Sequence, residues 1–168
     1  ITKTPGEEEE LSFMLNGTSA LGLDASGFYS GKNGNWGATV FASYNMGTPY
    51  DPADIGLTAI PEFDRFTLNP KLFVYFDDAT KMHAGVNLVT EKRLGGNIAF
   101  AKGEEVADPY FEANETDRIS TQFELDHGLG GTGRLQVKNS LNFYDRSIAI
   151  PNYAFGGRQF SSFSEANI

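Results

Sequence analysis

Residues 65–76 read RFTLNPKLFVYF, and their side chains alternate between apolar and polar along almost the whole stretch. One face of this series carries Phe66, Leu68, Leu72, Val74 and Phe76. A period of two is typical of a β-strand with one apolar and one polar face. The alternation returns in residues 81–93 after the turn 77–80, which predicts an antiparallel hairpin of long strands. Pro70 lacks a backbone donor, so we expect an edge or a bulge at that position.

The same hairpin pattern recurs along the chain. It joins residues 19–30 to 36–45 and residues 118–127 to 134–146, while 11–15 and 159–168 add a short first strand and the start of a last one. Short turns are predicted near 31–35, 77–80 and 128–133, and long connections near 46–64, 95–113 and 147–158. We therefore predict an all-β fold, an antiparallel meander of about seven strands.

Long strands with unequal connections are typical of a transmembrane β-barrel, whose short turns are periplasmic and whose long loops are extracellular. On that basis the strands starting near residues 19, 65 and 118 run inward, and those starting near 36, 81 and 134 run outward. The side chains expected on the lipid side are Trp36, Val40, Leu72, Val74, Val86, Leu88, Phe123, Leu125, Val137 and Leu141. If they converged on a closed core, the membrane hypothesis would be wrong.

Composition excludes several classes of protein. The 168 residues carry a net charge of -9, which disfavours a nucleic-acid partner because phosphates require a basic surface. No cysteine is present, so disulfides and thiolate metal sites are excluded. No apolar run approaches the roughly 20 residues of a membrane helix. The chain lacks an initiating Met and stops within a predicted strand, so we expect a segment of a larger protein.

Several stretches resemble Bacteroidetes-type TonB-dependent outer-membrane receptors. They are FDRFTLNPK at 63–71, EKRLGG at 91–96, NETDRIS at 114–120, KNS at 138–140 and YAFGGRQ at 153–159. The resemblance covers roughly residues 18–168, and the order and spacing of the stretches are more specific than any one of them. Residues 1–18 would then be a polar lead-in with a short strand, and 19–168 an incomplete barrel segment.

The resemblance implies a receptor in the bacterial outer membrane, with a barrel of 22 strands plugged by an N-terminal domain. It implies import of a scarce ligand such as a ferric siderophore, haem, cobalamin or a glycan. Outer-membrane lipid and the imported ligand would be partners, and TonB would bind through parts outside this segment. About seven strands are too few to close such a barrel. Neither a nucleotide-binding loop nor a catalytic triad is found, so we expect no enzyme and no cofactor.

Two groups of residues are candidates for a ligand site. Aromatic residues in or beside the long connections could form an apolar wall for the ligand, or could pack the loops: Tyr50, Phe63, Tyr110, Phe111, Tyr153 and Phe155. Charged residues at strand ends should gather at the outer rim: Arg65, Glu91, Arg93 and Arg118. They could steer anionic ligands, but we favour pairing with carboxylates such as Glu91 and Asp117.

Metal binding has weaker support. His83 and His127 are the only histidines and could both point into a lumen, but they lie near short turns, away from an incoming ligand. Asp51, Asp54, Glu62 and Asp64 make the first long connection rich in oxygen ligands, yet their spacing matches no EF-hand. We predict no metal site.

Two alternatives remain for the whole chain. A soluble antiparallel β-domain, lipocalin-like or a sandwich, would bind a small molecule or a protein partner. It would fold in water, with its apolar side chains in one core. An eight-stranded envelope barrel used for anchoring or adhesion is the other alternative.

Overall fold

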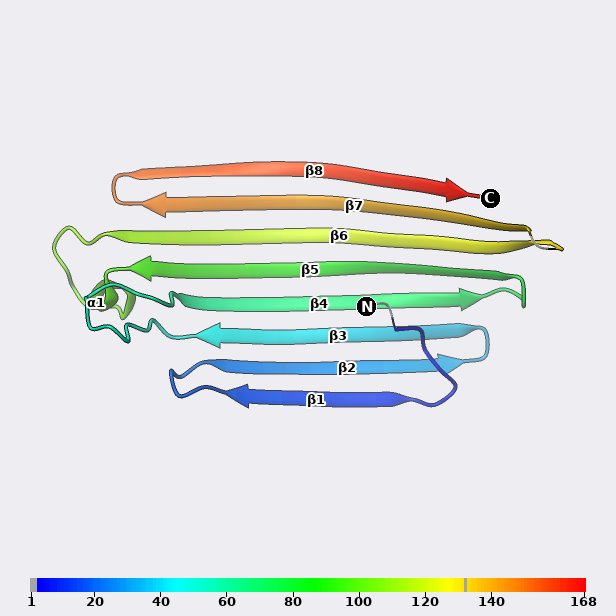
Figure 1. The fold of residues 1–168 in the computed structure, drawn as a ribbon, viewed down its shortest axis with the longest axis horizontal. Helices are drawn as coiled ribbons and strands as arrows, with labels where there is room; N and C mark the ends of the chain where they lie inside the picture. Colours follow the sequence, from blue (N-terminus) through cyan, green and yellow to red (C-terminus); the bar gives the residue numbers. More distant parts are fainter. Residues whose placement is uncertain (1–2, 132) are drawn as a thin grey trace.

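The computed structural model describes residues 3–131 and 133–168. Within these residues, eight strands form one antiparallel sheet in chain order (Figure 1). The strands are β1 Glu10–Gly17, β2 Leu23–Asn33, β3 Trp36–Gly47, β4 Glu62–Tyr75, β5 Thr80–Gly96, β6 Phe111–Gly130, β7 Gly133–Ile150 and β8 Tyr153–Asn167. Helix α1, Ile98–Ala101, is the only helix in the described part and is far too short to cross a membrane. The predicted antiparallel meander is confirmed, with eight strands instead of about seven.

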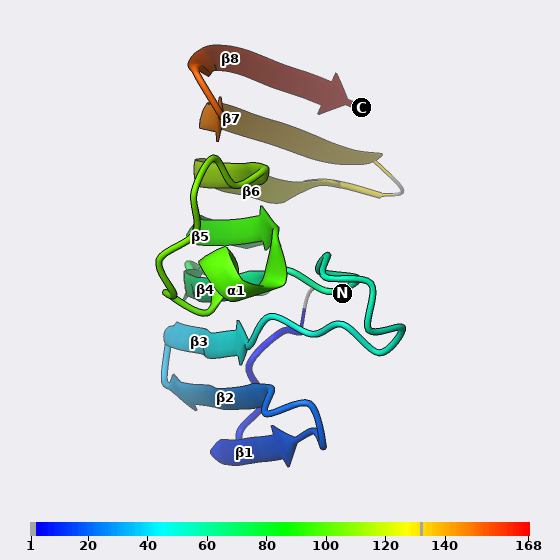
Figure 2. The ribbon, with the colours of Figure 1, turned by 90° about the vertical axis from the view of Figure 1, so that its left-hand side faces the viewer.

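The sheet is a single open layer, as its view from the loop end shows (Figure 2). Its longest strand, β6, has 20 residues and would extend about 65 Å at a rise of about 3.3 Å per residue. That length is well above the usual 3–10 residues of strands in globular proteins.

The register divides the sheet into an apolar and a polar face. Directly opposed residues of an antiparallel pair lie on the same face, and Trp36 lies opposite Val74 while Leu125 lies opposite Val137. Continuing the register from β3 to β7 places all ten predicted side chains together on what we call the apolar face. The opposite face, which we call the polar face, carries Thr67, Asn69, Lys71, Asn87, Gln122, Glu124, Gln136, Lys138 and Asn142.

The apolar side chains do not converge on a closed core. Only Phe73, Val74 and Ala101 are buried hydrophobic residues in the described part of the chain. Large side chains of the apolar face are open to the outside, among them Phe13 at 79% and Phe160 at 60% exposure. The described residues therefore lack the sizeable apolar core that a soluble domain of this length would bury.

Two of the three predicted long connections are present, and the third is not. Residues 48–61 and 97–110 are long loops, but β7 runs to Ile150 and β8 starts at Tyr153. The ladder continues through this region, with Arg146 opposite Gly157, so the prediction of a loop at 147–158 was wrong. Asn152 has φ +64°, a left-handed conformation that Asn tolerates better than most residues, and this permits a two-residue turn.

The turns between β2 and β3 and between β4 and β5 lie at the end of the sheet opposite the two long loops (Figure 1). Between β4 and β5, the Asp77 carboxylate accepts a 2.8 Å hydrogen bond from the Ala79 backbone N–H. Hydrogen bonds from Thr80 and Ala79 hold the pKa of the Asp77 carboxyl below its usual value.

Pro70 lies in the interior of the sheet, not at an edge or a bulge. It opposes Val40 on β3, and the β4–β5 ladder is interrupted only at residues 69–70 before it resumes in the same register. Asn69 donates a 3.3 Å hydrogen bond to the Asn87 side chain across this gap. The missing backbone N–H of Pro70 therefore interrupts the β4–β5 hydrogen bonding locally, and the strand continues on both sides.

The two long loops are attached to one another at the end of the sheet that also carries α1 (Figure 1). Thr58 donates its backbone N–H to the Gly96 carbonyl at 2.8 Å, and Ile98 donates to the Gly56 carbonyl at 3.0 Å. The Thr58 hydroxyl accepts from the Gly96 N–H at 2.9 Å. These hydrogen bonds hold the two loops together over this end of the sheet.

Candidate ligand-binding hollow

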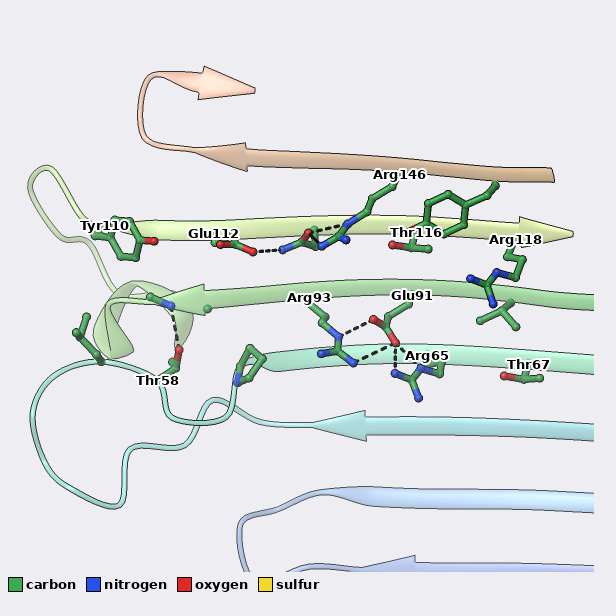
Figure 3. Close-up of a pocket in the computed structure, with 17 residues that line it drawn as sticks. Thr58, Arg65, Thr67, Glu91, Arg93, Tyr110, Glu112, Thr116, Arg118 and Arg146 are labelled. Atoms are coloured by element: carbon green, nitrogen blue, oxygen red, sulfur yellow. Dashed lines mark hydrogen bonds and ion pairs between the residues drawn. The ribbon is translucent and has the colours of Figure 1, made fainter. Parts of the chain in front are cut away.

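The polar face is hollowed at its loop end, over β4 to β7 (Figure 3). The hollow has a volume of about 790 Å³, and the paired loops close one side of it with Leu57, Thr58 and Pro61. Its charged and hydrogen-bonding side chains are Arg65, Thr67, Glu91, Arg93, Tyr110, Glu112, Asn114, Thr116, Arg118, Tyr144 and Arg146. All four rim charges predicted from sequence therefore line one cavity.

Glu91 is the centre of an ion-pair cluster. It lies opposite Arg65 in the β4–β5 register, two residues before Arg93 on the same strand, so the three side chains share one face. Arg93 donates from Nε to Glu91 Oε1 at 2.5 Å, and Arg65 pairs with Oε2 of the same carboxylate. The predicted pairing of rim arginines with Glu91 is confirmed.

The predicted pairing with Asp117 is wrong. Asp117 and Arg118 are neighbours on β6, so their side chains lie on opposite faces, and Asp117 lies on the apolar face. Arg118 instead places its guanidinium over the ring of Tyr144, 5.3 Å from the centroid. The two residues are directly opposed in the β6–β7 register, which brings them within reach of each other.

Arg146 is a residue of the hollow that the sequence interpretation missed. Its Nε and Nη2 both donate to Asn114 Oδ1, at 3.2 and 2.7 Å. Asn114 in turn donates to Glu112 Oε1 at 2.7 Å. The sequence does contain a sign of this position: Arg146 occupies every-second-residue spacing from Gln136 and Lys138 on β7, so its side chain is expected on the same polar face.

The lining of the hollow is basic although the chain is acidic. Four arginines face two glutamates, a local balance of +2, in a chain of net charge -9. Arginine side chains are donors only, each with five N–H groups. The cavity is therefore rich in donors and short of acceptors.

Only one of the six predicted aromatic residues lines the hollow. That residue is Tyr110, at the end of the second long loop. Phe63 lies beneath Arg93, with the guanidinium carbon 5.8 Å from its ring centroid. Phe111 stacks on Phe100 of α1 at 5.1 Å, which matches the alternative of loop packing.

The remaining aromatic candidates lie elsewhere. Tyr50 forms an isolated bridge with Ile60 within the first long loop. Tyr153 and Phe155 pack on each other at 5.8 Å beside the β7–β8 turn. A single aromatic wall for a ligand is therefore not formed by the six residues together.

The histidines do not form a pair. His83 lies on the polar face, stacked on Phe73 at 5.4 Å, whereas His127 lies on the apolar face and shares a 2.8 Å hydrogen bond with Thr80. The expectation that both could point into one lumen is wrong, because β5 and β6 present these two positions to opposite sides. Across residues 3–131 and 133–168, no cluster of potential metal ligands is formed.

Searches of family models, of curated proteins and of solved structures give no match to the chain. A function for the chain is therefore proposed from its own residues, register and cavity.

Proposed function

We propose that the chain forms part of the wall of a transmembrane β-barrel in a bacterial outer membrane, in a TonB-dependent receptor that imports a scarce ligand. The observation that carries the proposal is the separation of the two faces by the register. Apolar side chains share one exposed face, and the opposite face is polar and hollowed. A barrel wall requires this arrangement, because one face meets lipid and the other meets a wet lumen.

The dimensions of the apolar face fit a bilayer. The apolar stripe of β3 runs from Trp36 to Tyr44, nine residues, and therefore extends about 26 Å along the strand. A tilt of about 40° reduces its height to about 20 Å, close to the roughly 25 Å band of known barrels. Trp36 and Tyr44 at its two ends match the aromatic girdles found at membrane interfaces.

Charged side chains end the apolar face on the side of the loops. Lys92 pairs with Glu115 at 3.2 Å, and Arg158 pairs with Asp145 at 2.6 Å, all on the apolar face near the loop end. Charges of this kind are expensive at the centre of a bilayer and inexpensive at its interface. The occupant that fits a bounded apolar band of this height is lipid.

The edges of the sheet support membership of a larger barrel. In the described residues, β1 and β8 each pair on one side only, which leaves two rows of backbone groups without strand partners. Backbone groups cannot be left unpaired in lipid, so a spanning sheet must close. Further strands would pair with both edges.

The import function rests on the resemblance of residues 63–71, 91–96 and 114–120 to TonB-dependent receptors and on the position of the hollow. The hollow lies at the end of the sheet with the two long loops, where an external ligand would arrive. Crosslinking of the full-length protein in cells, followed by immunoblotting for TonB, should recover a complex. Failure to recover it would overturn the import function.

Spin labelling tests the orientation of the two faces. These 168 residues contain no cysteine, so Val86→Cys and Asn87→Cys would each add one labelling site on adjacent positions of β5, in a full-length protein whose cysteines outside this segment are replaced by serine. In the full-length protein in lipid vesicles, the label at 86 should be accessible to oxygen and the label at 87 to a water-soluble nickel complex. Equal accessibility of the two labels, or greater accessibility of the label at residue 86 to the nickel complex, would refute the barrel orientation.

A further inference from the structure

We infer that the hollow binds a small anionic ligand through an oxyanion, a phosphate or a carboxylate, held by Arg118 and Arg146. This inference rests on the proposed function for its setting, in which the hollow lies at the external end of the lumen.

The charges in the hollow favour an anionic ligand. Glu91 accepts both Arg65 and Arg93, so these two guanidinium groups already have a carboxylate partner. Arg118 and Arg146 have no carboxylate within ion-pair distance in the part of the chain that the structure describes. These two arginines therefore lack an ion-pair partner in a cavity whose balance, with Glu91 and Glu112 both counted, is +2, in a chain that is otherwise strongly acidic.

Both guanidinium groups are restricted by neighbouring side chains before a ligand arrives. The Arg118 guanidinium lies over the Tyr144 ring, 5.3 Å from its centroid, and this cation–π contact restricts its position. Arg146 uses two of its N–H groups on the neutral oxygen of Asn114, which fixes its direction and leaves three donors. Both side chains are held in place before a ligand arrives, which reduces the entropic cost of binding.

Arg118 and Arg146 are close to each other in the β6–β7 register. Arg118 lies opposite Tyr144, so Arg146 is its diagonal neighbour on β7, two residues further along. Diagonal neighbours in an antiparallel pair are about 7–8 Å apart at the backbone, which long side chains can bridge. Both side chains line the hollow, and an oxyanion placed between them would accept charge-assisted hydrogen bonds, which are among the strongest in proteins.

The size of the cavity limits the ligand to a small molecule. Its volume of about 790 Å³ lies within the roughly 300–1,000 Å³ of small-molecule sites. Thr116, opposite Arg146 in the register, and Tyr110, at the loop end of the hollow, add hydroxyl groups. These groups suit a polar body attached to the oxyanion.

Calorimetric titration of the full-length protein in detergent tests the inference, with inorganic phosphate and citrate as separate probes. We expect at least one of the two anions to bind, and the one that binds more tightly identifies the oxyanion as phosphate or carboxylate. Arg118→Ala and Arg146→Ala should each weaken binding about 10- to 100-fold, the worth of one strong charge-assisted contact. Arg118→Lys should restore part of the loss, because lysine keeps the charge but loses the planar fork.

Lys138→Ala is the matched control. Lys138 lies on the same strand and face as Arg146, eight residues away, and therefore about 26 Å from it. Its removal deletes the same charge and should leave the affinity within about two-fold, since surface charges at that distance are screened. Resistance of the folded variants to unfolding by sodium dodecyl sulfate without heating checks that each variant is folded.

Three outcomes would overturn the inference. They are absence of binding of both anions to the folded wild type, an equal loss with Lys138→Ala, and unchanged binding in both arginine variants. Any of these could occur while the spin labels still alternate between lipid and water, so failure here is distinguishable from failure of the proposed barrel.

Discussion

Val86→Lys should destabilise the folded protein in lipid far more than the same residue introduced on the other face. Val86 lies opposite Thr121 on β6. The β4–β5 pairs on both sides of the interruption at residues 69–70 place Val86 opposite Pro70. Pro70 is opposite Val40, the middle residue of the stripe from Trp36 to Tyr44. Val86 therefore lies near the midplane of the apolar band.

A lysine facing lipid at the midplane costs about 2–4 kcal/mol. That corresponds to a loss of about 30- to 700-fold in the ratio of folded to unfolded protein. Gln122→Lys, on the polar face of β6, should change the free energy of unfolding by no more than about 0.5 kcal/mol, because the lysine ammonium group remains hydrated.

Urea titration of the full-length protein in lipid vesicles would measure both variants, with the unfolding midpoint converted to a free energy by the linear relation. Similar costs at 86 and 122 would refute the assignment of the two faces. Folding of the wild type in buffer without lipid or detergent would also refute it, since the apolar face would then have another partner.

Three further outcomes are expected. Glu91→Gln changes the balance of the hollow from +2 to +3, so the affinity for whichever of the two anions binds should rise about five-fold in calorimetry, because two unit charges about 4 Å apart in water interact by about 1 kcal/mol; unchanged affinity would argue against an electrostatic site. Phe111→Ala removes the stack on Phe100, worth about 0.5–1.5 kcal/mol, and trypsin should then cleave faster at Lys102, with an unchanged rate as the contrary result. Asn152→Val should lower stability to urea by about 1–2 kcal/mol while Asn152→Gly does not, because φ at this turn is +64°; equal midpoints would contradict the turn geometry.

The faces of the strands could be predicted from sequence because side-chain alternation is a local property. Trp36 and Val40 fall on one face whatever their neighbours are, and Leu125 does so by the same rule on β6. Glycines mislead at 156–157, where a loop is the usual interpretation, because pairing with β7 overrides the low strand propensity of glycine. The same tertiary pairing keeps Pro70 inside the sheet.

The composition of the hollow could be predicted only in part. Arg65, Glu91, Arg93 and Arg118 were identified from their positions at strand ends. Which of them meet depends on register, a long-range property that alternation does not contain. Arg146 reaches Asn114 only because β6 and β7 pair as they do, and the same register directs Asp117 away from the hollow.

The hydrogen bonds between the two long loops limit which segments can be moved into another protein. Gly56 and Thr58 in the first loop are hydrogen-bonded to Ile98 of α1 and to Gly96 at the end of β5, so we expect each loop to depend on the other for its shape. A graft that moves residues 48–61 alone into another scaffold would leave both halves unsupported. Recombination or engineering should succeed only when residues 48–110 travel as one cassette, with β4 and β5 between the loops.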